Sequence, residues 1–362
     1  MRPAASLSRE VKRRHMEQLA QYRESLYLRP QLKSLFLELT TRCNERCLHC
    51  GSSCGDIVRE ELTLEQYREF LTKIKRDFGT DHPRICLTGG EPLMRPDFFE
   101  IAGMIHELGF RWGMTSNATL IDERAAELLE QTGMRTISVS LDGLRESHDS
   151  FRRTPGGWDK AMRGIQNLID CRTFGEIQIT TVVHKGNIGE LEELYQLLLD
   201  VDIDSWRVIN IDPIGRAKQH PELLLDADDY RRMFDFINNK RKTGMPLLYG
   251  CEHYLGADYE REVRDWYFLC NAGRYTAGIR SNGDIGACLD IEPRPELIEG
   301  NILQDDFTEL WKNGFRPYRC DLADSDKKCR ECPERRFCAG GAFHSFDFDN
   351  MDQQVCFKGI LF

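Results

Sequence analysis

Three cysteines lie close together in the segment TTRCNERCLHC, where Cys43, Cys47 and Cys50 have the spacing C-x3-C-x2-C. Three neighbouring thiolates can bind three irons of a [4Fe–4S] cubane, which normally takes four thiolates. One iron then stays open for a substrate or cofactor, as one position does in catalytic metal sites. A structural zinc knuckle is the alternative, although zinc sites favour paired C-x2-4-C elements. Cys54 follows four residues later, and we expect it to be a bystander.

The number of cysteines calls for a chemical explanation, because the chain has 14 of them in 362 residues. A chain of this length buries a core that needs no covalent staples. It has no apolar run long enough for a membrane span or a signal peptide. We therefore expect a cytoplasmic protein, in which reducing conditions favour metal binding over disulfides. The net charge of -10 argues against nucleic-acid and membrane partners.

Short apolar runs alternate with helical patterns over the first 215 residues or so. The expected strands are 35–39, 84–88, 111–116, 136–141, 177–183 and 206–211. The expected helices are 63–78, 96–108, 122–131, 158–170 and 188–200. Such repeated strand–helix units predict parallel strands with right-handed crossovers, in either a doubly wound sheet or an incomplete barrel. In both architectures the chemistry lies at the C-terminal ends of the strands.

The pattern changes after about residue 245, where Gly, Pro and Cys become frequent. Strands at 275–280 and 284–288 are expected to form a hairpin across Asn282-Gly283. Helices are also expected at 7–27 and near 226–241. We therefore expect an N-terminal helix (1–34), a core (35–215), a bridging helical segment (216–249) and a separate cysteine-rich unit (250–362).

The cysteine loop 43–50 resembles the C-x3-C-x-aromatic-C signature of radical S-adenosyl-L-methionine (SAM) enzymes. His49 has the aromatic position, which in that family lies against the adenine of SAM. Gly89, Gly90 and Glu91 resemble the start of the family's GGEP motif, whose backbone meets the methionyl amino group. Glycines suit such a loop because a side chain would block the close approach of the ligand.

Further motifs of this family follow at the ends of the next two expected strands. Ser116 and Asn117 resemble the polar pair that meets the ribose or carboxylate of SAM, and Ser140 and Asp142 belong to an SLDG segment. Arg152 resembles the arginine of the family's HDxFRG stretch, although a surface salt bridge explains it equally well. The resemblance implies that these residues bind the cofactor.

The C-terminal cysteines resemble the SPASM domain, which holds auxiliary iron–sulfur clusters. Cys270 and Cys288 match its C-x9-15-G-x4-C element, whereas Ala342 stands where a later cysteine is expected. The first auxiliary cluster would then use Cys270, Cys288 and, as the favoured extra ligand, Cys320; the alternatives are Cys251, a non-cysteine ligand, an open iron or no cluster. The second auxiliary cluster, for which a zinc ribbon is the alternative, would be bound by Cys329, Cys332, Cys338 and Cys356.

The resemblance implies an α/β fold: a partial (β/α)6 TIM-like barrel with a C-terminal cysteine-rich α+β extension. It implies an oxidoreductase that cleaves SAM reductively to a 5'-deoxyadenosyl radical, which abstracts hydrogen from a substrate. The cofactors would be SAM and [4Fe–4S] clusters, one that binds SAM and one or two auxiliary, with an electron donor of the flavodoxin or ferredoxin type.

A peptide or protein is the expected substrate, modified by cross-linking, thioether formation, epimerisation or oxidation. Oxidation of the sulfatase type is disfavoured because Leu289 follows Cys288, and Asp290 comes one residue later than that chemistry requires. A small molecule such as a tetrapyrrole, sugar or aminocyclitol is the alternative substrate, and a non-catalytic iron–sulfur or zinc scaffold is the alternative class of protein. His184, His253 and His344 are interpreted as structural, and no catalytic residue is assigned.

Overall fold

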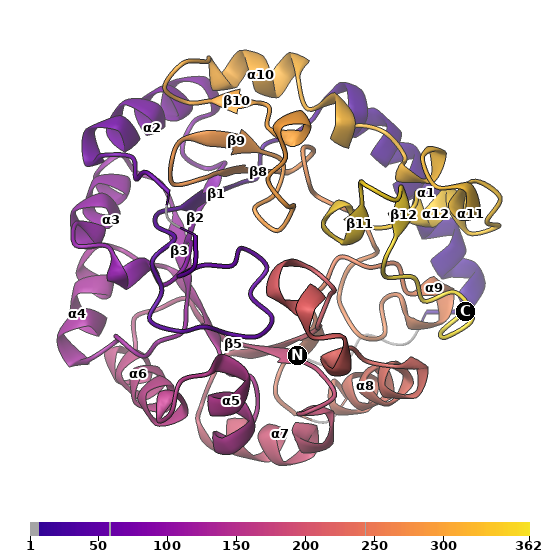
Figure 1. Ribbon diagram of the computed structural model, residues 1–362, viewed down its shortest axis with the longest axis horizontal. Coiled ribbons are helices and arrows are strands. Elements are labelled where there is room, and N and C mark those ends of the chain that lie inside the picture. The colour runs from indigo at the N-terminus through magenta and orange to yellow at the C-terminus, as the bar shows by residue number, and fades with distance from the viewer. Residues whose placement is uncertain (1–6, 58, 243) are drawn as a thin grey trace.

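A single sheet of ten strands runs through the computed structural model, which describes residues 7–57, 59–242 and 244–362. Residues 1–6 of the expected N-terminal part lie outside these ranges. The strand order is β10-β9-β8-β1-β2-β3-β4-β5-β6-β7. Helices form an arc outside the strands, and the C-terminal part of the chain occupies the remaining sector (Figure 1).

The six strands of the core pair in chain order and all in parallel, as the repeated strand–helix units predict. They are β1 (Ser34–Glu38), β2 (Arg84–Thr88), β3 (Trp112–Ser116), β4 (Thr136–Ser140), β5 (Glu176–Val183) and β6 (Ser205–Asn210). The helices that connect them are α2 (Leu64–Phe78), α3 (Phe98–Glu107), α4 (Glu123–Gln131), α5 (Arg145–Arg152), α6 (Gly157–Cys171) and α7 (Leu191–Asp200).

Helix α2 illustrates how local sequence signals determine where a helix begins and which face it buries. The Thr63 hydroxyl accepts the Gln66 N–H at 3.2 Å, and the Gln66 side chain accepts the Thr63 N–H at 2.8 Å. This capping box satisfies two backbone donors at the start of the helix. The buried residues of α2 are Tyr67, Phe70, Leu71 and Ile74. Helix periodicity places them on one face, and this apolar face packs toward the sheet.

The cysteine-rich segment 250–362 continues the sheet of the core. Strand β8 (Thr276–Ile279) pairs in parallel with β1, and β9 (Asp284–Gly286) pairs antiparallel with β8, which confirms the hairpin. On the other side, the unpredicted strand β7 (Leu247–Tyr249) pairs with β6. The segment is therefore continuous with the core, because β8 forms hydrogen bonds with backbone groups at the edge of β1 that would otherwise be unpaired.

The other elements lie mainly around this cysteine-rich segment. They are α1 (Arg9–Leu28), α8 (Ala227–Lys240), α9 (Gly256–Tyr259), β10 (Gly300–Asn301), α10 (Phe307–Asn313), α11 (Lys327–Arg330), α12 (Arg335–Cys338), β11 (Phe346–Asp347) and β12 (Asp352–Gln353). Helix α1 is bound to the cysteine-rich segment by the buried side chain of Arg23, which donates to the carbonyl oxygens of Arg336 (3.1 Å) and Phe337 (3.2 Å). The N-terminal helix is thus an integral part of the fold.

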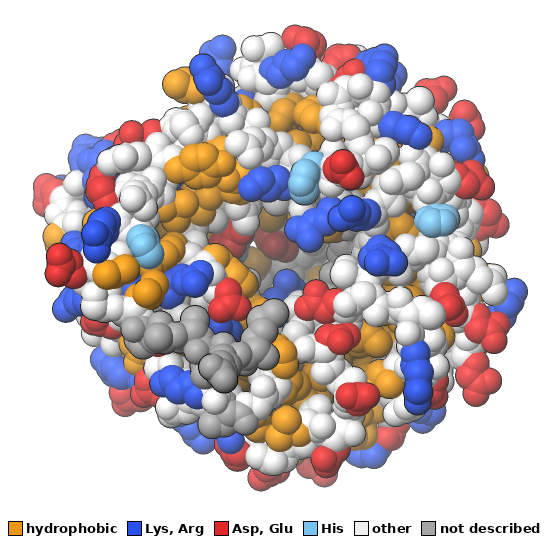
Figure 2. Space-filling view, turned by 180° about the vertical axis from the view of Figure 1, so that it is seen from behind, with side chains coloured by type: hydrophobic (Ala, Val, Ile, Leu, Met, Phe, Trp, Pro, Cys, Tyr) orange, Lys and Arg blue, Asp and Glu red, His pale blue; other side chains and the backbone are white. Residues whose placement is uncertain are grey.

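Seen from behind, the molecule has a hollow near the middle of its surface, with both acidic and basic side chains around it (Figure 2). Within the described ranges, none of the helices combines the length and the apolar character needed to cross a membrane.

Candidate active site

A cavity of about 340 Å³ lies where the core strands end, as expected for parallel α/β folds. The structure brings nearly all of the expected N-terminal site residues into its wall. They are Cys43, Cys47, His49, Cys50, Gly89, Gly90, Ser116, Asn117, Ser140, Asp142 and Arg152. Glu91 is fully buried and supports this wall from behind through its hydrogen bonds.

The two glycines after β2 allow the cysteine loop to pack directly on the strand end. The Gly90 N–H donates to the Thr40 carbonyl oxygen at 2.9 Å. A Cβ at Gly89 would lie 2.3 Å from that oxygen, and one at Gly90 would lie 2.0 Å from the Arg42 carbonyl oxygen. Backbone of the cysteine loop therefore occupies the space that a side chain would need, which is a reason for glycine beyond the expected approach of a ligand.

Glu91 links the end of β2 to the end of β3. Its carboxylate accepts the Ser116 hydroxyl at 2.9 Å and the Asn117 N–H at 2.8 Å. Burial raises the pKa of Glu91 to about 7, although these hydrogen bonds act in the opposite direction. The Ser116 hydroxyl also accepts the Ala118 N–H at 2.9 Å, so protein groups already occupy it on both sides.

Arg152 forms a buried ion cluster that ties α5 to the cysteine loop. Its guanidinium donates to Asp142 at 2.8 Å and to Glu45 at 2.7 Å, and each side chain is at most 6% exposed. Burial would raise the pKa of Asp142, but the charge of Arg152 holds it at about 2. The structure thus excludes a surface salt bridge for Arg152, because both of its partners are buried.

Three aromatic rings are stacked beside the cysteine loop. His49 stacks on Phe151 with ring centroids 4.4 Å apart, and Phe151 stacks on His184 at 3.8 Å. Burial lowers the pKa of both histidines to about 4, so the imidazoles are neutral at pH 7. Nδ1 of His49 is buried without a hydrogen-bond partner among the described residues, and a bound ligand would satisfy it.

Two of the three sulfur atoms of the cysteine loop accept backbone hydrogen bonds, whereas the Cys47 thiol donates to Oε2 of Glu45 at 3.6 Å. The N–H of Glu45 donates to Sγ of Cys43 at 3.4 Å, and the N–H of Cys54 donates to Sγ of Cys50 at 3.4 Å. Such N–H···S bonds are known to tune iron–sulfur clusters. Cys54 therefore lies next to the loop as a hydrogen-bond donor, and its expected role as a bystander stays a prediction.

Six cysteines of the C-terminal segment fall into two groups. Burial raises the pKa of Cys338, and the nearby thiols of Cys356, Cys329 and Cys332 act in the same direction, so these four sulfurs form one group. Burial likewise raises the pKa of Cys288, with Cys270 among its neighbours.

Cys320, the expected extra ligand, has a different environment from Cys270 and Cys288. Its thiol is exposed and donates to the Pro317 carbonyl oxygen at 3.2 Å. The charged neighbours of this thiol are Arg274, Asp321 and Asp324. Its role as a ligand of the first auxiliary cluster stays a prediction.

The structure adds polar residues to the cavity wall that were not expected there: Arg207 and Asp212 carry no sequence motif, and His344 was interpreted as structural. Arg207, Asp212, Asp290 and His344 line it together with Cys251. The available signal for Asp212 was its place directly after an expected strand, where parallel α/β folds carry functional residues. His344 lies far away in sequence, and no local pattern connects it with this cavity.

Comparison with known proteins identifies the family to which this chain belongs. The model of the radical SAM superfamily matches residues 37–198, and the model of the SPASM iron-sulfur cluster-binding domain matches residues 270–333. The AdoMet-dependent heme synthase of Methanosarcina barkeri is 30% identical over 322 residues, which cover 84% of this chain and 89% of that protein. The chain belongs to the radical SAM superfamily. Its expected cofactors, SAM and [4Fe–4S] clusters, are confirmed at the level of the family.

Other proteins that are similar to this radical SAM protein have different names, and two of them are solved structures with a similar fold. Mycofactocin maturase MftC of Mycobacterium tuberculosis is 29% identical over 339 residues, or 89% of this chain and 82% of that protein. The solved structure of anSMEcpe with AdoMet and a peptide has a TM-score of 0.68 at 20% identity, over 90% of this chain and 92% of that chain. Streptococcus suis SuiB bound to S-adenosylmethionine has a TM-score of 0.67 at 20% identity, over 87% of this chain and 74% of that chain. These two structures confirm the expected fold.

Proposed function

We propose that this radical SAM protein oxidises a side chain of a peptide or protein substrate. The observation that carries the proposal is a second cavity of about 270 Å³, which shares Gly51, Ile214, Asp290 and His344 with the first. The two cavities adjoin at these residues, and the second is also lined by segment 343–349. Adjoining cavities give room for a substrate that is larger than its reacting group, and the printed title of the anSMEcpe complex with a peptide supports this class of substrate.

We propose that Cys43, Cys47 and Cys50 hold the cluster that supplies the electron for cleavage of the SAM sulfonium. The Arg152 ion cluster keeps the cysteine loop in place, because Arg152 binds Glu45 within that loop. The stack of His49 on Phe151 offers an uncharged flat surface to the cofactor. Four cysteines at the other end, Cys329, Cys332, Cys338 and Cys356, are proposed to hold an auxiliary cluster that exchanges an electron with the substrate.

Arg207 on β6 supplies the cavity with a positive charge for a carboxylate. Its Nε donates to the Thr180 hydroxyl at 3.1 Å, and among the described residues it has no ion pair with an Asp or Glu. A half-buried guanidinium of this kind favours a substrate anion. This feature also favours a second candidate function, the modification of a carboxylated tetrapyrrole, which the heme synthase relative supports.

The proposal is tested in two stages with anaerobically reconstituted protein, SAM and dithionite. We expect release of 5'-deoxyadenosine, and we expect no release when Cys43, Cys47 and Cys50 are all replaced by Ala. Cys171→Ala, a change at the end of α6, is the matched control and should keep the activity. Release by the triple variant at the wild-type rate would refute the cluster assignment.

The second stage identifies the substrate class. Candidate peptides from any short reading frames beside the gene are added, and mass spectrometry follows the loss of a hydrogen pair from each peptide. Conversion of a carboxylated tetrapyrrole with no change in any peptide would replace the first proposal by the second. Arg207→Met should raise the KM for either anionic substrate, whereas uncoupled release of 5'-deoxyadenosine should persist.

A further inference from the structure

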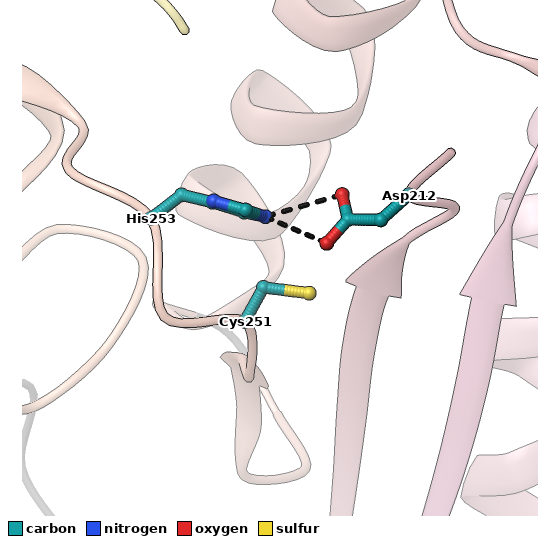
Figure 3. A group of neighbouring side chains, drawn as sticks. All are labelled: Asp212, Cys251 and His253. Carbon is teal, nitrogen blue, oxygen red and sulfur yellow. Dashed lines mark hydrogen bonds and ion pairs between the residues drawn. The ribbon is translucent and has the colours of Figure 1, made fainter. Parts of the chain in front are cut away.

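Side chains from three distant segments lie close together at the cavity wall. Asp212 follows β6, and Cys251 and His253 follow β7, with their ligand atoms all within 4.8 Å of one another (Figure 3). Nε2 of His253 lies 3.0 Å from Oδ2 of Asp212. Nε2 of His344, from the C-terminal segment, lies 2.9 Å from the same oxygen. We propose that Asp212, Cys251, His253 and His344 bind a single divalent transition-metal ion.

The chemistry of the donor atoms determines the class of ion. One thiolate, two imidazoles and one carboxylate suit zinc or ferrous iron, whereas magnesium and calcium take oxygen ligands. Zinc bonds of about 2.0 to 2.1 Å in a tetrahedron place neighbouring nitrogen and oxygen ligands about 3.3 Å apart. The N···O separations between Asp212 and the two histidines, from 2.9 to 3.2 Å, are close to this value.

The charge of the group favours a bound cation. The Asp212 side chain is 6% exposed, and its only ion pairs within the described ranges are those with His253 and His344. A buried carboxylate needs a positive partner. A divalent ion would supply it, and Asp212 together with the Cys251 thiolate would neutralise both of its charges.

The surrounding side chains hold the ligands in place, as the outer shell of a metal site does. Arg264 is fully buried and donates to the carbonyl oxygens of Cys251 at 2.8 Å and His253 at 2.7 Å. The Asn210 side chain donates to Oδ1 of Asp212 at 2.6 Å. The loop that carries two of the ligands is thus tied down by a guanidinium, and the carboxylate is oriented by an amide.

The position of this group gives the ion a role beyond the proposed function. Asp212, Cys251 and His344 line the same cavity as the cysteine loop. An ion bound there would face the substrate space, where it can coordinate a donor atom of the substrate if one ligand, such as His344, is displaced. The inference holds for either class of substrate.

The test uses the reconstituted holoenzyme, loaded anaerobically with zinc and freed of excess metal. We expect about one zinc per chain, with one sulfur near 2.3 Å and otherwise nitrogen or oxygen ligands in the X-ray absorption spectrum at the zinc edge. The iron of the clusters does not contribute at this edge. Cys251→Ser should remove the sulfur signal, and Asp212→Asn should lower the zinc content at least tenfold.

Control substitutions and iron analysis distinguish zinc bound at this site from zinc bound elsewhere on the chain. Cys171→Ser and His220→Ala, which alter a thiol and an imidazole elsewhere, should leave the zinc signal unchanged. Unchanged iron content in Cys251→Ser shows that the chain is folded and that Cys251 is not a ligand of an iron–sulfur cluster. The proposal is overturned by absence of zinc, by a spectrum with no sulfur or with several sulfurs, or by iron loss in Cys251→Ser.

Discussion

The buried ion cluster of Arg152 allows a quantitative prediction. Arg152→Met keeps most of the side-chain volume but leaves Asp142 and Glu45 buried without their cation. Removal of one partner from a buried ion pair costs about 3 to 5 kcal/mol. Since Arg152 serves two carboxylates that are 0% and 1% exposed, we expect a loss in the upper part of this range.

The assay is denaturant unfolding of the anaerobic holoenzyme, followed by tryptophan fluorescence. Arg153→Met is the matched control, because Arg153 is the next residue and is exposed; a surface change of this kind alters the free energy of unfolding by about 0.5 kcal/mol or less. The addition of Glu45→Gln to Arg152→Met should recover part of the loss, since it removes one of the two uncompensated charges.

The pH dependence of the loss has a definite sign. In the wild type the pKa of Asp142 is lowered to about 2, so its stabilisation is complete above about pH 4 and is lost only as the pH falls through 2. Without Arg152, burial should raise the pKa of Asp142. The difference in stability between variant and wild type should therefore be larger at about pH 8 than at about pH 5.5. A loss below about 1 kcal/mol, or no recovery with Glu45→Gln, would refute this reasoning.

Three further predictions concern the rest of the site. Gly90→Ala should push the cysteine loop away and abolish 5'-deoxyadenosine release, because its Cβ would lie 2.0 Å from a loop carbonyl oxygen, whereas Gly189→Ala, with no atom within 4 Å, should be neutral in the same assay. Glu91→Gln should flatten the pH dependence of unfolding between about pH 4.5 and 7, where the raised pKa of Glu91 makes the wild type less stable as the pH rises; an unchanged slope would contradict this. Cys356→Ser should lower the iron content by about four per chain, and Cys171→Ser should not; an equal count in both variants would remove Cys356 from the auxiliary cluster.

Local patterns in the chain were sufficient for most of the core. The strands were expected within one or two residues of β1 to β6, because each is a short apolar run between helical patterns. Helix α5 was missed: its sequence RESHDSFR is polar, and its buried positions His148, Phe151 and Arg152 do not form an apolar stripe. β7 was missed because its three residues are too few for a period to be seen.

One part of the candidate site could be predicted from local sequence motifs, and the other part could not. The cysteine loop and the motifs at the ends of β2, β3 and β4 are continuous in sequence, and parallel pairing places such strand ends at one edge of the sheet. The group of Asp212, Cys251, His253 and His344 comes from three separate segments, and each histidine by itself has a structural explanation. Their convergence depends on how the C-terminal segment returns across the cavity.

The sequence by itself determined the family and the parallel core and predicted which thiols bind iron–sulfur clusters, because cysteine spacing and strand-end motifs are local and can be recognised without knowledge of the fold. The tertiary structure alone decided that β8 completes the edge of β1, that Arg152 neutralises two buried carboxylates, and that Cys320 is exposed. These features depend on burial and on contacts between distant segments, and neither quantity is encoded in any short stretch of the chain.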